Sequence, residues 1–510
     1  MELKNILDQY KINYSMYGND MAKVDIMNKK KGKIILVTAT NPTKYGEGKT
    51  TVAIGLNDAF KKLGYNSIAS LREPSMGPVF GVKGGATGGG KAVIVPEDKI
   101  NLHFTGDFHA ITSANNLICA LIDNHIYQGN ELDIQNVTFN RCLDMNDRAL
   151  RNITIKDKRY EREEIFNITA ASEIMGVFCL AKDMDDLRSR ISDIIIGYNS
   201  KNEEIYVKDL KCVEAVIALL LDAMKSNAVK SLEDNLVLVH GGPFANIAHG
   251  CSSLISLNTA RSISDYVITE AGFGSDAGAT KFLDILSRNN FDEIYATVLI
   301  TTIRALKLNG DGELEKGISN LQAHIDILKA FNVNVVVTLN KFEDDTDDEI
   351  KFVQEYVEKQ NIKFAINEVY LKGSIGGIDL ANKILEFEDN SKINYLYDLN
   401  DKLEDKINKY LSNIGCIKYN ASDEVKEKIK EFNKYKYPIC VAKTQYSISD
   451  DPKKLGYPKD YEVTIRDIKV NNGSKFIVIY LGDIITMPGL SKNPSALEIK
   501  IENDVIYLPR

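Results

Sequence analysis

The sequence of 510 residues contains no tryptophan, although it contains 24 tyrosines and 18 phenylalanines. A site that binds a flat ring by stacking must therefore use tyrosine or phenylalanine in this protein. The seven cysteines are scattered and include no pair at CxxC spacing. An odd number of cysteines without a spacing pattern is typical of reduced thiols in a cytosolic protein and argues against a disulfide framework.

The sequence also lacks an excess of basic residues and a long apolar run. Asp and Glu (71) outnumber Lys and Arg (63), which gives a net charge of -8. Binding to a nucleic-acid backbone needs clustered cations, so we expect no nucleic-acid partner. No apolar run approaches the ~18 residues of a membrane span, and the N-terminus has no apolar signal-peptide core. We therefore expect a cytoplasmic protein without a membrane partner.

What the sequence does contain is a series of short, nearly continuously apolar runs separated by helical patterns. Such runs are typical of buried parallel strands, and they predict an α/β fold with a doubly wound, mostly parallel sheet. Several runs end in small polar or glycine-bearing loops, where ligands bind in such sheets, so distant loops are expected to form one site. The runs are Lys33–Ala39, Asn66–Leu71, Leu236–His240, Tyr266–Glu270, Ala296–Thr301, Val333–Leu339 and Lys363–Val369.

Residues 34–60 have the layout of a phosphate-binding loop (P-loop): a buried strand, a glycine-bearing loop and a helix. Glycines let backbone N–H groups approach phosphates, the helix N-terminus adds a positive dipole, lysine reaches the phosphates and a hydroxyl binds Mg²⁺. Thr43 stands where the standard pattern has glycine, so an ordinary strand–helix turn is the alternative. The predicted ATP-binding residues are Thr43, Lys44, Tyr45, Gly46, Glu47, Gly48, Lys49, Thr50 and Thr51.

Two distinctive segments follow the second predicted strand. Arg72 is a fork-shaped donor that suits carboxylate or phosphoryl oxygens, so it could clamp a small acid against the γ-phosphate. A surface ion pair with Glu73 is the alternative. The segment from Gly77 to Gly90 contains seven glycines, which predicts close backbone approach to a ligand or a mobile lid. A flexible linker is the alternative for this segment.

The segment 101–116 carries His103, Asp107 and His109 at close spacing. These residue types suggest a zinc site, but no fourth ligand at usable spacing is visible, and polar packing is the simpler interpretation. Asp107 is a candidate general base or Mg²⁺-linked group if this segment faces the phosphate-binding loop.

Long stretches of the chain resemble the formate–tetrahydrofolate ligase family, also called formyltetrahydrofolate synthetase. The stretches follow the family order and cover nearly the whole sequence. They include PTKYGEGKTT (42–51), LREPSMGPVFGVKGGATGGG (71–90), NLHFTGDFHA (101–110), VHGGPFANIAHGCSS (239–253), VITEAGFGSDAGATKFLDI (267–285), VAKTQYSISDDP (441–452) and MPGLSKNPSA (487–496).

The resemblance implies a reaction in one-carbon folate metabolism. ATP, formate and tetrahydrofolate give ADP, phosphate and 10-formyltetrahydrofolate, through formyl phosphate. It also implies ATP with Mg²⁺ as the nucleotide, tetrahydrofolate as a substrate, a monovalent cation (K⁺ or NH₄⁺) as an activator, and a homotetramer. The phosphoryl-transfer step fits a P-loop that presents the γ-phosphate to a small carboxylate, with Lys, Arg and Mg²⁺ stabilising the transition state.

The resemblance also assigns roles to individual residues. Lys49 and Thr50 are expected to serve the ATP phosphates and Mg²⁺, and Arg72 to hold formyl phosphate. Glu73 and Asp107 match acidic residues that line the same site, and Asp107 is our candidate for steering or deprotonating the amine. Loops around the phosphates are matched by His240, Gly241, Gly242 and Glu270.

The folate pocket is where the sequence departs from the family pattern. The resemblance implies that two rings sandwich the folate heterocycle. Phe342 matches one ring, and Tyr370 stands in place of a tryptophan; Glu343 replaces a usual proline. A tyrosine still stacks, with less area. Two alternatives to an active ligase follow: the same acyl-phosphate chemistry with a different acceptor, or a nucleotide-binding paralogue without turnover.

We predict three domains from the length and the motifs. Residues 1–335 are expected to form a large domain that binds ATP and formyl phosphate. Residues 336–430 are expected to form an α/β domain with the folate pocket, and residues 431–510 a small C-terminal α/β domain.

Overall fold

The fold is built on one large sheet. The computed structural model describes residues 1–29, 31–44, 46–83, 85–289, 291–503 and 505–509. Within these residues the sheet has twelve strands. Ten follow one path, and β6 (Ala92–Val95) pairs with β14 off this path and carries β5 (Gly88–Gly89). In path order the ten are β1 (Tyr14–Tyr17), β2 (Met21–Val24), β14 (Ser226–Ser231), β15 (Leu236–Val239), β4 (Ser67–Leu71), β16 (Tyr266–Glu270), β3 (Lys33–Ala39), β18 (Ala296–Thr301), β19 (Val335–Asn340) and β20 (Lys363–Asn367).

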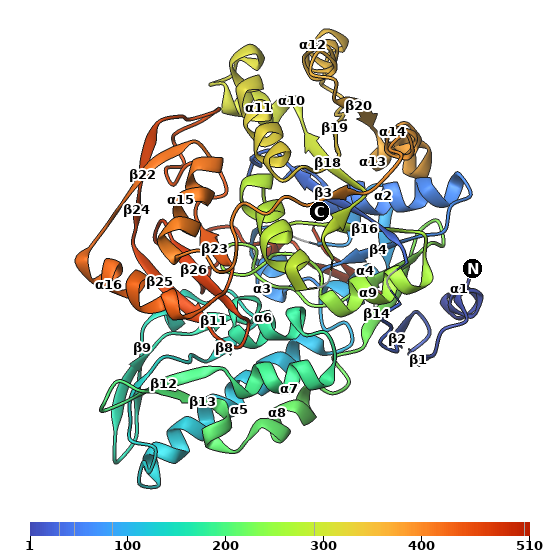
Figure 1. The fold of residues 1–510 in the computed structure, drawn as a ribbon. Helices are drawn as coiled ribbons and strands as arrows, with labels where there is room; N and C mark the ends of the chain where they lie inside the picture. Colours follow the sequence, from blue (N-terminus) through green and yellow to red (C-terminus); the bar gives the residue numbers. More distant parts are fainter. Residues whose placement is uncertain (30, 45, 84, 290, 504, 510) are drawn as a thin grey trace.

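The strands from β15 to β20 run parallel to one another, whereas β1, β2 and β14 add antiparallel pairs at one edge. The prediction of an α/β fold with a large, mostly parallel sheet is therefore confirmed. β3, β16 and β18 have the bounds predicted from their apolar runs. Because β3 lies between β16 and β18, the loop that follows its carboxyl end lies near the middle of the parallel part of the sheet (Figure 1).

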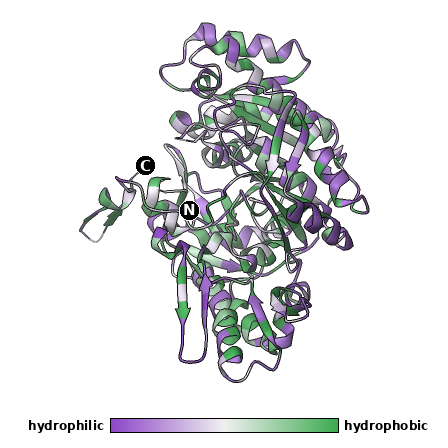
Figure 2. Ribbon diagram, turned by 90° about the vertical axis from the view of Figure 1, so that its left-hand side faces the viewer, coloured by the Kyte–Doolittle hydropathy of each residue, from purple (hydrophilic) through white to green (hydrophobic). Residues whose placement is uncertain are grey.

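Both faces of the sheet are covered, because successive side chains of a strand point to opposite faces. In β3, Ile34 and Leu36 join a core with helices α9 (Leu254–Ile263) and α11 (Leu314–Ala330). Ile35 and Val37 instead join a core with α2 (Lys49–Lys62) and α14 (Ile378–Leu385). Figure 2 shows the hydrophobic residues gathered on the central strands and the hydrophilic residues on the outer helices.

Two further regions pack beside the sheet, each with its own core. The first contains α5 (Asp107–Tyr127), α6 (Glu173–Leu180), α7 (Met184–Ser192), α8 (Val213–Leu220) and the small sheet β7 (Ile134–Val137), β12 (Ile195–Asn199) and β13 (Glu204–Tyr206). The second is C-terminal and contains α15 (Leu403–Asn413), α16 (Asp423–Glu431), β22 (Cys416–Ala421) with β24 (Tyr461–Ile465), and β23 (Ile439–Ala442), β26 (Phe476–Tyr480) and β25 (Asp467–Asn471).

The pairing of β19 and β20 with the large sheet concerns the first predicted domain boundary. β19 pairs with β18, and β20 pairs with β19. The predicted boundary between residues 335 and 336 therefore falls at the start of a strand that is hydrogen-bonded to the large sheet.

Within the described part of the chain, no helix is both long and apolar enough to cross a membrane.

Candidate active site

The loop of residues 40–48 (the 40–48 loop) connects β3 to α2 at the carboxyl edge of the sheet. Gly46 and Gly48 have φ values of +79° and +73°, a left-handed conformation that favours glycine. Gly48 is the residue that precedes the first turn of α2, so the free N–H groups of that turn start here. Such a helix N-terminus attracts anions. Tyr45, a predicted ATP-binding residue, lies outside the described residues.

Glu47 ties the 40–48 loop to the protein interior. Its side chain is buried, and its two carboxylate oxygens accept hydrogen bonds from the Thr43 backbone N–H (2.7 Å) and the Thr302 hydroxyl (2.5 Å). Thr302 also caps α10 (Ile303–Asn309) by accepting from the Ala305 N–H. The Glu47 carboxylate therefore joins the loop to the N-terminus of α10.

Three predicted site residues meet beside the loop: Thr50 from the first turn of α2, Arg72 directly after β4, and Glu270 at the end of β16. The Thr50 hydroxyl donates to Glu270 Oε2 at 2.9 Å. The Arg72 guanidinium lies 3.7 Å from Glu270 Oε1. A Cβ on Gly272 would approach Arg72 Nη1 to 3.0 Å, so the guanidinium lies directly on that glycine. The Thr50 hydroxyl and the Glu270 carboxylate supply the hard oxygen ligands that suit Mg²⁺.

Glu73 and Asp107 form a buried acidic pair. Asp107 accepts a hydrogen bond from Lys23 Nζ (2.5 Å) and from Asn227 Nδ2 (2.7 Å). Burial, together with the nearby Asp107 carboxylate, holds the pKa of Glu73 well above its usual range. Burial also raises the pKa of Asp107, while the Lys23 ammonium opposes that rise. The pair thus has one cation for two carboxyls, and Glu73 is the carboxyl that favours the protonated form.

His240, Gly241 and Gly242 lie at the end of β15, next to Glu73. The His240 ring is buried, with Nε2 donating to the Ala223 carbonyl (2.7 Å) and Nδ1 2.5 Å from the Ser253 hydroxyl. Burial lowers the pKa of His240 to about 3, so the ring is neutral. The Gly241 carbonyl accepts from the Glu73 N–H at 2.7 Å. Any contribution of this loop to a ligand therefore comes from its backbone.

The two predicted folate-stacking rings follow the adjacent strands β19 and β20. The Arg304 guanidinium carbon lies 3.8 Å from the centroid of the Phe342 ring. Tyr370, in α13 (Val369–Lys372), is 52% exposed. It lies on Gly90, where a Cβ would approach the Tyr370 carbonyl to 2.1 Å. Gly89 and Gly90, at the end of the glycine-rich segment, therefore pack against Tyr370.

The histidines of the 101–116 segment turn toward each other. His103 Nδ1 lies 2.8 Å from His109 Nε2, whereas Asp107 faces Lys23. In the portion of the chain that the structure describes, no group of three or more His, Cys, Asp or Glu side chains is arranged to hold a metal ion.

The family model described as "Formate--tetrahydrofolate ligase" matches residues 2–507. The chain belongs to the formate–tetrahydrofolate ligase family. A formate–tetrahydrofolate ligase of Caldicellulosiruptor saccharolyticus is 46% identical over 543 residues, which cover 99% of this chain and 97% of the relative. That of Campylobacter concisus is 50% identical over 513 residues, 96% of this chain and 93% of the relative. That of Staphylococcus aureus (strain JH9) is 47% identical over 514 residues, with the same coverage.

Sequence reasoning missed three residues of this formate–tetrahydrofolate ligase family member that hold the 40–48 loop. Besides Thr302, Arg304 Nη2 donates to the Gly46 carbonyl (3.1 Å) and Asn340 Nδ2 donates to the Glu47 carbonyl (3.3 Å). All three come from the carboxyl ends of β18 and β19, the first and second strands on one side of β3 in the sheet. The only signal in the sequence was their position directly after predicted strands.

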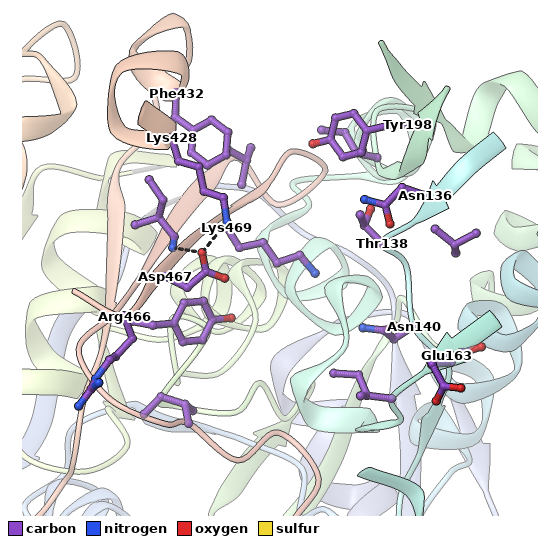
Figure 3. Close-up of a pocket in the computed structure, with 18 of the residues that line it drawn as sticks. Asn136, Thr138, Asn140, Glu163, Tyr198, Lys428, Phe432, Arg466, Asp467 and Lys469 are labelled. Carbon is purple, nitrogen blue, oxygen red and sulfur yellow. Dashed lines mark hydrogen bonds and ion pairs between the residues drawn. The ribbon is translucent and has the colours of Figure 1, made fainter. Parts of the chain in front are cut away.

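A cleft of about 1000 Å³ opens away from this site, between the region of β7 and the C-terminal region (Figure 3). Lys469 extends into it from β25 toward Thr138 and Asn140. None of the predicted site residues lines this cleft. The candidate site of this family member is therefore the cluster at the carboxyl edge of the sheet.

Proposed function

We propose that this protein ligates formate to tetrahydrofolate in an ATP-dependent reaction that gives 10-formyltetrahydrofolate, ADP and phosphate. Membership of the formate–tetrahydrofolate ligase family supports this proposal. The single structural observation that carries it is the meeting of Thr50, Glu270 and Arg72 beside the 40–48 loop. That cluster combines a phosphate-binding loop, oxygen ligands for Mg²⁺ and a fork-shaped cation for a small acid.

In the first step, a formate oxygen attacks the γ-phosphorus of ATP, the bond to the ADP oxygen breaks, and formyl phosphate forms. The backbone N–H groups of the 40–48 loop and Lys49 hold the phosphates. Thr50 and Glu270 would hold Mg²⁺, which neutralises phosphate charge. Arg72 binds the formate carboxylate and then the formyl phosphate, because its guanidinium lies at the edge of this cluster.

In the second step, the N10 amine of tetrahydrofolate attacks the formyl carbon and phosphate leaves. The carbon–oxygen bond to phosphate breaks as the new carbon–nitrogen bond forms, and the amine proton passes to Asp107, our candidate for deprotonating the amine. We assign Glu73, next to Arg72 in the chain, and the nearby Asp107 to an acidic wall of this site. We assign the steering of the amine to this wall, with Lys23 balancing the charge on Asp107.

We assign the folate heterocycle to the space at the ends of β19 and β20, between Phe342 and Tyr370. The half-exposed Tyr370 ring is available for stacking. We further propose that the protein works in the cytoplasm as a homotetramer and that K⁺ or NH₄⁺ stimulates it. We also propose that residues 1–335 bind ATP and formyl phosphate, that residues 336–430 carry the folate pocket, and that residues 431–510 form a small C-terminal domain. The family relationship supports these proposals.

A spectrophotometric assay with formate, MgATP and tetrahydrofolate tests the proposed function. We expect 10-formyltetrahydrofolate to accumulate only when all three are present, and Arg72→Ala to abolish it. Formate-stimulated ATP hydrolysis without formyl transfer would instead identify an enzyme with a different acceptor. Absence of both reactions in the purified full-length chain would identify a nucleotide-binding paralogue.

A further inference from the structure

A single guanidinium links the 40–48 loop to the ring of Phe342. Arg304 Nη2 donates to the Gly46 carbonyl at 3.1 Å, and the Arg304 Cζ atom lies 3.8 Å from the centroid of the Phe342 ring. Gly46 belongs to the proposed nucleotide site, and Phe342 belongs to the proposed folate site. Arg304 is thus the one described side chain for which the structure gives contacts with both.

The position of Arg304 is fixed by its surroundings. It lies in the first turn of α10, whose N-terminus is capped by Thr302, and Thr302 in turn donates to the Glu47 carboxylate. Arg304 Nε is buried and has no hydrogen-bond partner among the described residues. The charge of Arg304 also acts on Asp345, which accepts from the Phe342 N–H at 2.8 Å. Arg304 therefore contacts this segment through the Phe342 ring, and the Asp345 carboxylate fixes the backbone that carries the ring.

This arrangement restricts how a flat ligand can stack. The guanidinium covers one face of the Phe342 ring, so an incoming heterocycle has only the opposite face. A cation over one face also restricts the tilt of the ring, because the interaction weakens as the guanidinium leaves the ring axis. Arg304 therefore positions the Phe342 ring, the proposed stacking surface for folate (the folate platform), without contacting folate itself.

We propose that Arg304 couples the binding of nucleotide and folate, so that each ligand tightens the binding of the other. The inference rests on the proposed function. Nucleotide on the 40–48 loop fixes the Gly46 carbonyl, which holds the guanidinium over Phe342, and the folate platform is thereby ordered before folate arrives. Linkage requires that the effect be reciprocal: folate must tighten nucleotide by the same factor.

The test is a pair of calorimetric titrations of the full-length protein. Tetrahydrofolate is titrated with and without saturating Mg²⁺ and adenylyl imidodiphosphate, and this ATP analogue is titrated with and without tetrahydrofolate. For the wild-type protein we expect both affinities to rise by the same factor, at least about fivefold. Arg304→Lys keeps the charge but loses the planar fork that both bonds and stacks. We expect it to bring this factor below about twofold, a change that a purely structural role would not produce.

Arg466, an exposed arginine on the rim of the separate cleft, provides the matched control. We expect Arg466→Lys to keep the wild-type factor. A second variant, Arg304→Gln, and a melting curve for each protein separate lost coupling from lost folding. The proposal is overturned if wild type binds both ligands independently, or if folded Arg304→Lys and Arg304→Gln keep the wild-type factor. If wild type binds nucleotide but no tetrahydrofolate, the proposed function itself fails.

Discussion

Introducing the first tryptophan of the chain at residue 370 gives a direct measure of the folate site. Tyr370 is half-exposed and has one ring edge against Gly89, where a Cβ would come within 3.0 Å of its Cε2 atom. The larger indole must therefore extend from the open side of the ring. In Tyr370→Trp we expect it to do so without disturbing α13, because the exposed half of the side chain has room.

The expected gain follows from the added stacking area. Aromatic side chains bury roughly 150–250 Å² each, so the change from phenol to indole adds a few tens of Å². At about 25 cal/mol per Å², this is worth about 0.5–1 kcal/mol. Because about 1.4 kcal/mol corresponds to tenfold in affinity, tetrahydrofolate should bind about twofold to fivefold more tightly. The KM for ATP should stay unchanged.

The same substitution supplies the assay, because the chain has no other tryptophan. Titration with tetrahydrofolate should quench the emission of Trp at position 370 with a midpoint that agrees with the KM. Tyr507→Trp is the matched control, since Tyr507 is 51% exposed and lies on the C-terminal strand β28 (Val505–Tyr507). If the emission of Tyr370→Trp does not change with tetrahydrofolate, or if Tyr507→Trp is quenched equally, the assignment of Tyr370 to the folate site is refuted.

Three further predictions concern charged groups. Arg72→Ala should abolish formyl transfer while calorimetry still detects ATP binding; loss of nucleotide binding would contradict its role. Lys23→Met leaves the buried Asp107 carboxylate unpaired, so chemical denaturation should show a loss of about 3–5 kcal/mol, and an unchanged midpoint would contradict the ion pair. Burial raises the pKa of Asp58 to about 7, from a usual value of 3.8. Its native state therefore binds more protons than the unfolded state between these values, and stability should fall by up to about 1.4 kcal/mol per pH unit as pH rises through them. Asp58→Asn should flatten this slope, and a wild-type slope in the variant would assign it elsewhere.

The sequence predicted the parts of the site that depend on short-range patterns. The apolar run 33–39, the glycine-bearing loop and the helix that follows are all read within thirty residues, and β3 and α2 form there. Strand ends could also be located, because buried parallel strands are continuously apolar. Tertiary packing adjusted some ends: β20 stops at Asn367, and Val369, which had been placed in that strand, begins α13.

The contacts that the sequence did not reveal join residues far apart in the chain. Lys23 meets Asp107, and Arg304 meets Gly46, through pairings that only the order of strands in the sheet creates. No local pattern distinguishes Arg304 from other arginines near the end of a strand. The sequence also did not reveal the burial of the His240 ring against Ala223 and Ser253, because these three residues come from separate segments of the chain.

The place of β3 in the middle of the sheet has a consequence for synthesis of the chain. β3 ends at residue 39, but its neighbours β16 and β18 begin at residues 266 and 296. At roughly 5–20 residues per second, a ribosome needs tens of seconds to supply both partners. During that time an apolar strand and the loop that follows it have no native sheet to join. The N-terminal segment of the nascent chain therefore exposes apolar surface throughout that time. A chain that stops before residue 296 lacks β18, one of the two strands that pair with β3.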